Sequence, residues 1–191
     1  MAAIGLGVVL SVGFGCTTSA PRRAESQAVP KAGTEPVQTS VGPIQHPLKA
    51  AFGTQLVLLG YNLKPDGDTL KPGETVTITW YWQVIEPLQG EWTELTHITS
   101  GGNAVKQNCD GVGDIRKSQP PQTWTKGQIV VDRQVITLKK DYASTVAQFR
   151  IGLYSKGNGK RLKPTSGPSD QDARILGPKF KTGVPPPPKA K

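Results

Sequence analysis

A strict alternation of polar and apolar side chains constrains the fold of this chain more than any other feature. Between positions 75 and 82, three threonines and a tyrosine alternate with four large apolar residues: Val76, Ile78, Trp80 and Trp82. Successive side chains of a β-strand point to opposite faces of a sheet, so a period of two indicates a half-buried strand. We therefore expect Trp80 and Trp82 to lie in a hydrophobic core and Tyr81 to face outward.

Other short segments rich in β-branched and aromatic residues predict further strands. They lie at residues 55–61, 92–98, 129–138 and 148–154, with shorter ones near 104–107 and 175–180. The chain also contains 22 glycines and 17 prolines, which weaken helix interiors, and no segment has a sustained helical period. The sequence therefore predicts an all-β fold. We expect an antiparallel β-sandwich, immunoglobulin-like or jelly-roll-like, over residues 51–180, with disordered N-terminal and C-terminal segments.

The first sixteen residues form a short apolar segment that ends at Gly15-Cys16 and is followed at once by polar residues. The segment is too short to cross a bilayer as a helix. It resembles the lipobox of bacterial lipoproteins, in which the cysteine is lipidated after cleavage, and this implies lipidation of Cys16. The resemblance also implies an outer-membrane address, because Thr17 rather than Asp follows the cysteine. The alternatives are an ordinary cleaved signal peptide and a buried apolar segment with a chance cysteine.

Residues 17–50 are rich in Ser, Thr and Pro and have no apolar period. Such a segment buries too little apolar surface to offset its ordering entropy, so we expect a disordered linker. Residues 181–191 form a basic tail whose four consecutive prolines favour polyproline II.

The order of several short motifs between residues 52 and 154 resembles an accessory domain found beside bacterial membrane-embedded glycosyltransferases. That domain is regarded as an immunoglobulin-like or carbohydrate-binding-module-like sandwich, which agrees with the fold expected from the alternation. The resemblance assigns no ligand-contacting residues. The matching motifs are Gly60-Tyr61, Pro72-Gly73, Trp80-Tyr81-Trp82-Gln83, Trp124-Thr125-Lys126-Gly127, Asp132 and Gly152-Leu153-Tyr154.

The formal net charge is +9, and two thirds of this excess lies in residues 17–50 and 177–191. Flanking charge of this kind favours solubility and weak attraction to anionic surfaces. A nucleic-acid-binding module would carry a basic stripe interleaved with stacking aromatic residues, which the sequence lacks. We therefore expect no nucleic-acid partner.

Three aromatic residues are candidates for ligand binding because we expect them at the surface. Tyr81 lies on the outward side of its strand, and Trp92 and Trp124 stand near expected strand starts. If they are exposed together, they form a platform of the kind on which sugar rings stack. A structural role in the core is the alternative.

The titratable residues form no recognisable catalytic motif. Cys109 fits a buried thiol, and His97 is the candidate partner that a catalytic cysteine would need. Glu94 lies three positions before His97 in one strand, so we expect their side chains on opposite faces. The acidic loop 110–114 lacks the full calcium-loop pattern, so we expect no metal and no cofactor.

These observations lead to one functional expectation with two alternatives. We expect a non-enzymatic envelope lipoprotein, lipid-anchored to the membrane, whose sandwich binds or scaffolds an envelope protein or glycan. The alternatives are an enzyme acting on cell-wall polysaccharide and a purely structural assembly subunit. An enzyme requires convergent titratable groups in a cleft, and a structural subunit requires no exposed aromatic platform.

Overall fold

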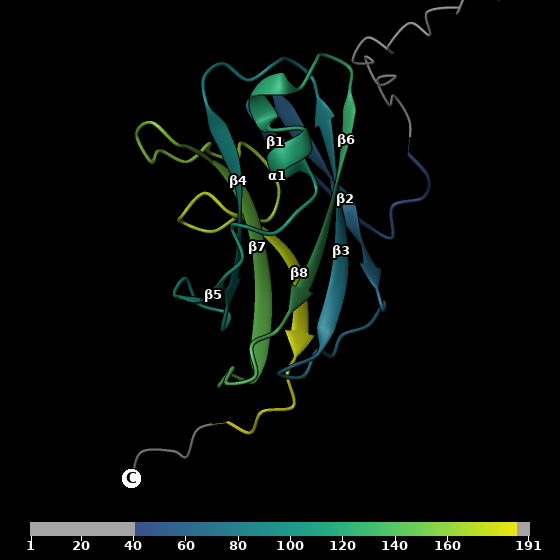
Figure 1. Ribbon diagram of the computed structural model, residues 1–191, viewed down its shortest axis with the longest axis vertical. Coiled ribbons are helices and arrows are strands. Elements are labelled where there is room, and N and C mark those ends of the chain that lie inside the picture. The colour runs from purple at the N-terminus through teal and green to yellow at the C-terminus, as the bar shows by residue number, and fades with distance from the viewer. Residues whose placement is uncertain (1–40, 187–191) are drawn as a thin grey trace, which may run out of the picture. The chain divides into compact units, whose positions relative to one another are not determined.

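Eight strands form two antiparallel four-stranded sheets in the computed structural model, which describes residues 41–186 (Figure 1). The predicted all-β sandwich is thereby confirmed. The first sheet has the order β1-β2-β3-β6 and the second β5-β4-β7-β8. The strands are β1 (His46–Phe52), β2 (Leu56–Lys64), β3 (Thr75–Val84), β4 (Trp92–Thr99), β5 (Val105–Asn108), β6 (Ile129–Thr137), β7 (Val146–Ser155) and β8 (Ile175–Lys181).

The pairing of the strands agrees with the immunoglobulin type of sandwich. Consecutive strands β3 and β4 belong to different sheets and pair with β6 and β7, which are also consecutive. Immunoglobulin-type domains interlock in this way, with their second strand beside the fifth and the third beside the sixth. The arrangement brings residues from opposite halves of the sequence into one core.

The core lies between the sheets and is built on the inward positions of the alternating strands. Trp80 and Trp82 are both 0% exposed, as the alternation predicts. Phe52 packs against Trp82 with ring centroids 5.6 Å apart, and Gly177 of β8 lies directly against Trp80. A Cβ atom at Gly177 would stand 2.5 Å from the Trp80 ring, so the close packing of the two sheets requires glycine there.

The start of the sandwich differs from the expected linker boundary at residue 50. β1 begins at His46 and pairs with β2, and its Ala50 and Phe52 are fully buried. The assignment of residues 46–50 to a disordered linker was therefore wrong. The lipobox-like segment with Cys16, most of the linker and residues 187–191 lie outside the described residues.

Hydrogen bonds from other parts of the chain engage a few residues on the outer edges of both sheets. Beside β1, the backbone amides of Thr165 and Ser166 donate to the carbonyl of Ala51. Beside β8, the 68–70 segment exchanges backbone hydrogen bonds with Lys181. The edges of β5 and β6 are linked by the Gln107 side chain, whose Nε2 donates to the Thr137 carbonyl at 2.9 Å and whose Oε1 accepts from the Lys139 amide.

Residues 109–124, named here the bridging segment, cross the side of the sandwich between β4 and β6 (Figure 1). The bridging segment contains the short helix α1 (Ile115–Ser118) and the 3-10 helix η1 (Pro121–Thr123). Ile115 and Trp124 are buried and join the core. Among residues 41–186, no helix has the length and apolar character needed to span a bilayer.

Candidate binding site

The three aromatic candidates do not form one exposed surface. Tyr81 lies half-buried on the outer face of the first sheet, and its hydroxyl accepts a hydrogen bond from Asn62 Nδ2 at 3.0 Å. Trp92 is half-buried at the start of β4 in the second sheet, and its indole nitrogen donates to the Gln89 carbonyl at 2.8 Å. The two side chains therefore belong to different sheets of the sandwich.

Trp124 is a core residue, so the expectation that it is exposed was wrong. Its side chain is 1% exposed and packs against Trp82 with ring centroids 6.0 Å apart. Its indole nitrogen donates to the Gln119 carbonyl at 2.8 Å. The bridging segment folds back over the side of the sandwich and brings Trp124 onto the core, a long-range contact that its place before a strand does not reveal.

A buried pair of carboxylates lies beneath the bridging segment, between β4 and β6. Glu94 is 1% exposed and Asp132 is 0% exposed, and both accept hydrogen bonds from Gln134 Nε2, at 3.2 and 2.7 Å. Trp82 Nε1 donates to Glu94 at 3.1 Å, and the Ile115 amide donates to Asp132 at 3.2 Å. Every one of these donors comes from the domain itself, so the carboxylate pair is satisfied without a ligand.

The electrostatics of the carboxylate pair favour the protonated form of Glu94. Burial raises the pKa of Glu94 well above its ordinary value of 4.5, and the charge of Asp132 and a hydrogen bond between the two side chains raise it further. The positive charge of Arg116 on the bridging segment and the hydrogen bond from Trp82 act in the opposite direction but are weaker. Two carboxylates in contact cannot both ionise cheaply, so Glu94 is the group that holds the proton.

Replacing Glu94 by glutamine is expected to flatten the dependence of stability on pH above about pH 5. A carboxyl whose pKa is raised by folding stabilises the protein fully below its unfolded pKa, and this contribution is lost as pH rises through the folded pKa. The wild-type protein should therefore lose up to about 1.4 kcal/mol of unfolding free energy per pH unit within that window. Glutamine keeps an uncharged donor and acceptor at the position, so the loss should disappear. Urea denaturation at about pH 5 and about pH 8 measures the difference.

Glu91→Gln is the matched control, because Glu91 is exposed and lies only three positions away. It should follow the wild-type pH dependence. Equal slopes for wild type and Glu94→Gln between these pH values would contradict a raised pKa of Glu94 in the folded protein.

Cys109 and His97 do not form a catalytic pair in this structure. Cys109 is 5% exposed, and burial raises the pKa of its thiol to about 11, so the thiol stays protonated at neutral pH. His97 lies on the opposite face of β4 from Glu94, as expected, and its Nδ1 is 3.1 Å from Arg174 Nη1. A guanidinium only donates, so Nδ1 accepts, and Nε2–H donates to Asp110 Oδ1 at 3.3 Å. His97 is thus a hydrogen-bonded residue of the second sheet, with Arg174 and Asp110 as its partners.

Two buried arginines organise the outer face of the second sheet. Arg150 and Arg174 have side chains that are 4% and 0% exposed, and both contact the carboxylate of Asp170, which is itself 5% exposed. Arg174 also donates to Asp172 at 2.9 Å. We call Arg150, Asp170, Asp172 and Arg174, together with His97, the arginine network. It was not predicted from the sequence, since its members come from β4, β7 and the segment before β8.

Hydrogen bonds determine the ionisation of two acids at this network. Asp170 lies at its centre, and Asp110 contacts its member His97. Burial opposes ionisation of Asp170, but hydrogen bonds from the backbone and side chain of Arg174 and from Arg150 outweigh it and lower the pKa. For Asp110 burial is likewise outweighed, by hydrogen bonds from His97, the Thr96 amide and Asn108, and its pKa is also lowered. Both acids are therefore charged at neutral pH. The carboxylate of Asp110 is bonded to His97, Thr96 and Asn108 of the domain itself.

A small pocket opens at the edge of β4, beside the bridging segment. It has a volume of about 250 Å³. Behind it, Arg116 Nη2 is buried with no hydrogen-bond partner among the described residues. The pocket is smaller than the roughly 300–1,000 Å³ typical of small-molecule sites. Its lining residues are Thr93, Glu94, Asp110, Ile115, Arg116, Pro120, Pro121, Tyr154 and Lys156.

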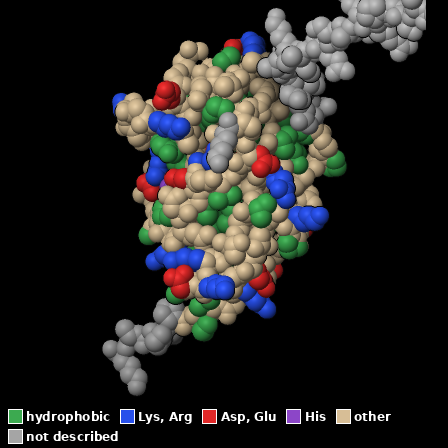
Figure 2. Space-filling model, in the orientation of Figure 1, with side chains coloured by type: hydrophobic (Ala, Val, Ile, Leu, Met, Phe, Trp, Pro, Cys, Tyr) green, Lys and Arg blue, Asp and Glu red, His purple; other side chains and the backbone are tan. Residues whose placement is uncertain are grey.

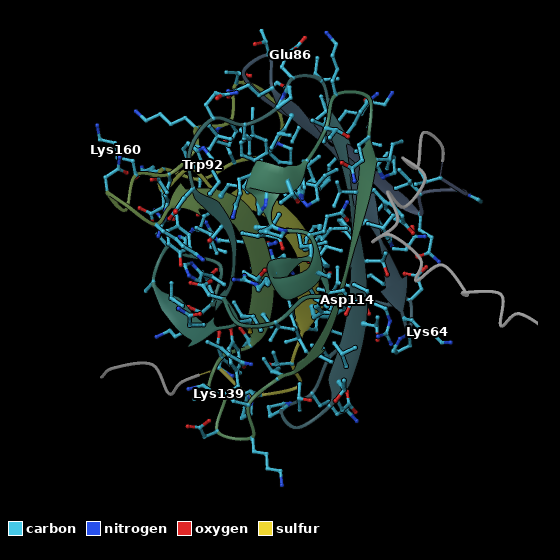
Figure 3. The ribbon with its side chains drawn as sticks, turned by 45° about the horizontal axis from the view of Figure 1, so that its top comes forward. Lys64, Glu86, Trp92, Asp114, Lys139 and Lys160 are labelled. Atoms are coloured by element: carbon cyan, nitrogen blue, oxygen red, sulfur yellow. The ribbon has the colours of Figure 1, made fainter. Side chains whose placement is uncertain are left out.

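A larger, open groove lies beside the turn that follows β7. Its volume is about 640 Å³, and it runs between residues 159–163 and residues 171–173. Figure 3 shows Lys160 projecting outward on the opposite side of the domain from Lys64. We call this feature the basic groove. Its lining residues are Gly159, Lys160, Arg161, Lys163, Gln171, Asp172 and Ala173.

The charges of the basic groove differ from those of the surrounding surface. On the face shown in Figure 2, basic and acidic side chains are interspersed. In contrast, residues 156–163 contain four basic residues and no acidic one. The ion pairs found within residues 41–186 include Lys126, Lys139 and Lys181 but no lysine from 156–163. Lys160 and Lys163 therefore present positive charge to solvent without an ion-pair partner among the described residues, whereas Arg161 lies 4.0 Å from the Asp172 carboxylate.

The described residues contain no group of three or more His, Cys, Asp or Glu side chains arranged to hold a metal ion. The acidic loop is used internally, since Asp110 caps the edge of β4 and contacts His97.

Comparison with known proteins finds no family model that matches the chain and no significantly similar curated protein. The basic groove is thus the feature of the described residues best suited to meeting a partner.

Proposed function

We propose that this chain is a lipid-anchored protein of the bacterial envelope, placed at the outer membrane, whose sandwich binds another envelope component, a protein or a glycan. The observation that carries the binding role is the basic groove, an open surface whose lysines have no partner among the described residues. Other conspicuous polar groups, such as the arginine network and the carboxylate pair, are bonded within the domain. Within residues 41–186, the groove combines an open surface with two exposed lysines, Lys160 and Lys163, that form no ion pair.

Binding fits the geometry better than the alternative of polysaccharide hydrolysis. Glycoside hydrolases place two carboxylates about 5–10 Å apart across an open cleft. Glu94 and Asp132 instead share the Gln134 donor nitrogen, and both are almost fully buried, so they do not face each other across an open cleft. We therefore assign the carboxylate pair a structural role.

Binding is tested by capture of partners with the full chain from detergent-solubilised envelopes, together with measurement on an array of bacterial glycans. The proposal expects at least one envelope component to be retained specifically. Recovery of no partner, combined with uniform signals across the array, would contradict it and favour the purely structural alternative.

The anchor is tested by replacing Cys16 with alanine and labelling cells with a fatty-acid analogue. Wild type should incorporate label and stay with the membrane fraction, since the acyl chains of a lipoprotein contribute about 0.8 kcal/mol per buried CH₂. The Cys16→Ala variant should lose the label and become soluble. Cys109→Ala is the matched control and should keep the label, and label retained by Cys16→Ala would refute the anchor.

A further inference from the structure

The residues of the basic groove indicate the chemistry of its occupant. Lys160 and Lys163 are exposed, flexible ammonium groups, whereas Arg161 is held in place. Arg161 Nη1 donates to the Asp172 carbonyl at 2.8 Å and lies 4.0 Å from the Asp172 carboxylate. An oriented guanidinium presents a planar fork of donors that matches the two oxygens of a carboxylate or phosphate.

The wall of the groove is fixed to the body of the domain through the arginine network. Asp172 accepts a hydrogen bond from Arg174 Nη2 at 2.9 Å, and its amide donates to Asp170 Oδ1, also at 2.9 Å. Arg174 is fully buried. A chain of contacts therefore runs from the core to Arg161. Groups held in this way lose less conformational entropy on binding than free surface side chains do.

The composition of the groove distinguishes between classes of partner. Its lining contains no aromatic side chain, and Ala173 is the only apolar residue other than glycine in it. A neutral glycan requires aromatic faces for stacking. A protein partner requires buried aromatic or aliphatic anchors, and single-stranded nucleic acid requires stacking platforms. None of these requirements is met by the groove, whereas three basic side chains around an open channel suit a chain of oxyanions.

We infer that the basic groove binds an acidic glycan of the envelope, which is a polymer with repeated carboxylate or phosphate groups. This inference rests on the proposed function. Arg161 binds one oxyanion through its fork, and Lys160 and Lys163 neutralise its neighbours along the polymer. Lys156, on the same turn, extends the positive surface beyond the groove. The contacts are electrostatic and solvent-exposed, so binding weakens as salt concentration rises.

The test reverses the charges in the groove and compares the result with an equal change elsewhere. The variant is Lys160→Glu/Arg161→Glu/Lys163→Glu, and the control is Lys106→Glu/Lys140→Glu/Lys179→Glu, three exposed lysines that form no ion pair within residues 41–186. Both full-length proteins have the same net charge. A milder variant with glutamine at positions 160, 161 and 163 guards against misfolding, and melting temperatures of all variants establish that they fold.

The probes are polygalacturonate for carboxylates, a phosphate-bearing mannan for phosphates, neutral dextran, single-stranded DNA and vesicles of phosphatidylglycerol. At about 50 mM salt, wild type should bind one or both acidic glycans and not dextran. Reversal of the three groove charges should weaken this binding about tenfold or more, the glutamine variant should weaken it less, and the control triple should stay within about twofold of wild type. The stronger of the two acidic probes identifies the oxyanion.

Equal losses in the groove variant and the control would show general charge attraction and overturn the inference. Tighter binding to DNA or to vesicles than to both acidic glycans would overturn it too, by assigning the groove to nucleic acid or lipid. If wild type and the groove variant capture the same envelope components equally well, the proposed function stands and the groove is not its site. If wild type captures nothing from envelopes, the proposed function itself fails.

Discussion

Replacing Asp170 by asparagine is expected to lower the free energy of unfolding by about 3–5 kcal/mol, because it leaves two buried guanidinium groups without their shared counter-charge. Asp170 contacts both Arg150 and Arg174, whose side chains are 4% and 0% exposed. Removing one partner of a buried ion pair is costly even where the intact pair stabilises little, since the remaining charge stays desolvated. Urea denaturation at neutral pH, followed by tryptophan fluorescence, measures the loss.

Asp141→Asn is the matched control for this substitution. Asp141 also forms an ion pair, with Lys139 at 3.7 Å, but its side chain is 81% exposed. Exposed pairs contribute about 0–1 kcal/mol, so the control should remain close to wild type. Similar small losses for both variants would mean that the arginine network does not hold the loops of the second sheet in place.

The second large effect is expected for Trp124→Ala, which should destabilise the domain by about 3–5 kcal/mol. The substitution removes a side chain that is 1% exposed and leaves a cavity against Trp82. It also removes the donor that bonds the Gln119 carbonyl and thereby fastens the end of the bridging segment. Thermal and urea denaturation of the full chain measure the loss.

Two comparisons separate a core role of Trp124 from a role in binding. Trp92→Ala should cost less stability, because Trp92 is only half-buried. Trp124→Phe should restore part of what alanine loses, since it refills most of the cavity. A Trp124→Ala protein with wild-type stability and reduced glycan binding would contradict the core role of Trp124. It would instead support a role of Trp124 in ligand binding.

The alternation in the sequence was enough to predict the sandwich, because the strongest strands carry their core residues in a strict period of two. β3 follows the expected pattern along its whole length, from Thr75 to Val84. β1 was missed for a physical reason. It is an edge strand with a proline at position 47, and prolines are tolerated at edges, where no ladder hydrogen bond is lost. Its pattern is also interrupted by a register shift between Pro47 and Ala50.

The carboxylate pair was missed although a signal for it was present. Glu94 shares its face of β4 with Trp92 and Ile98, so the period of two already pointed it toward the core. Asp132 lies on the inward face of β6, which it shares with Val130 and Ile136. An acid on an apolar face predicts a buried polar cluster, and applying that rule would have found both residues.

The arginine network and the basic groove could not have been assembled from the sequence. His97 and Arg174 are in contact although 77 positions separate them, and no motif marks the relation. The positive run at 156–163 is visible in the sequence, but its meaning depends on residues 171–173, which form the opposite wall of the groove. Pairings between distant segments are fixed by the topology of the two sheets, which alternation alone does not determine.

The partly engaged sheet edges have a consequence for a protein that we propose is held at a membrane. Anchoring in two dimensions crowds identical molecules together, and an unprotected strand at a sheet margin would then recruit its neighbour's strand and start a polymer. Here the backbone of Ala51, Thr137 and Lys181 is already engaged by segments of the same chain. These contacts shorten the stretch of free edge with which a neighbouring copy could pair, and so oppose edge-to-edge association of anchored molecules.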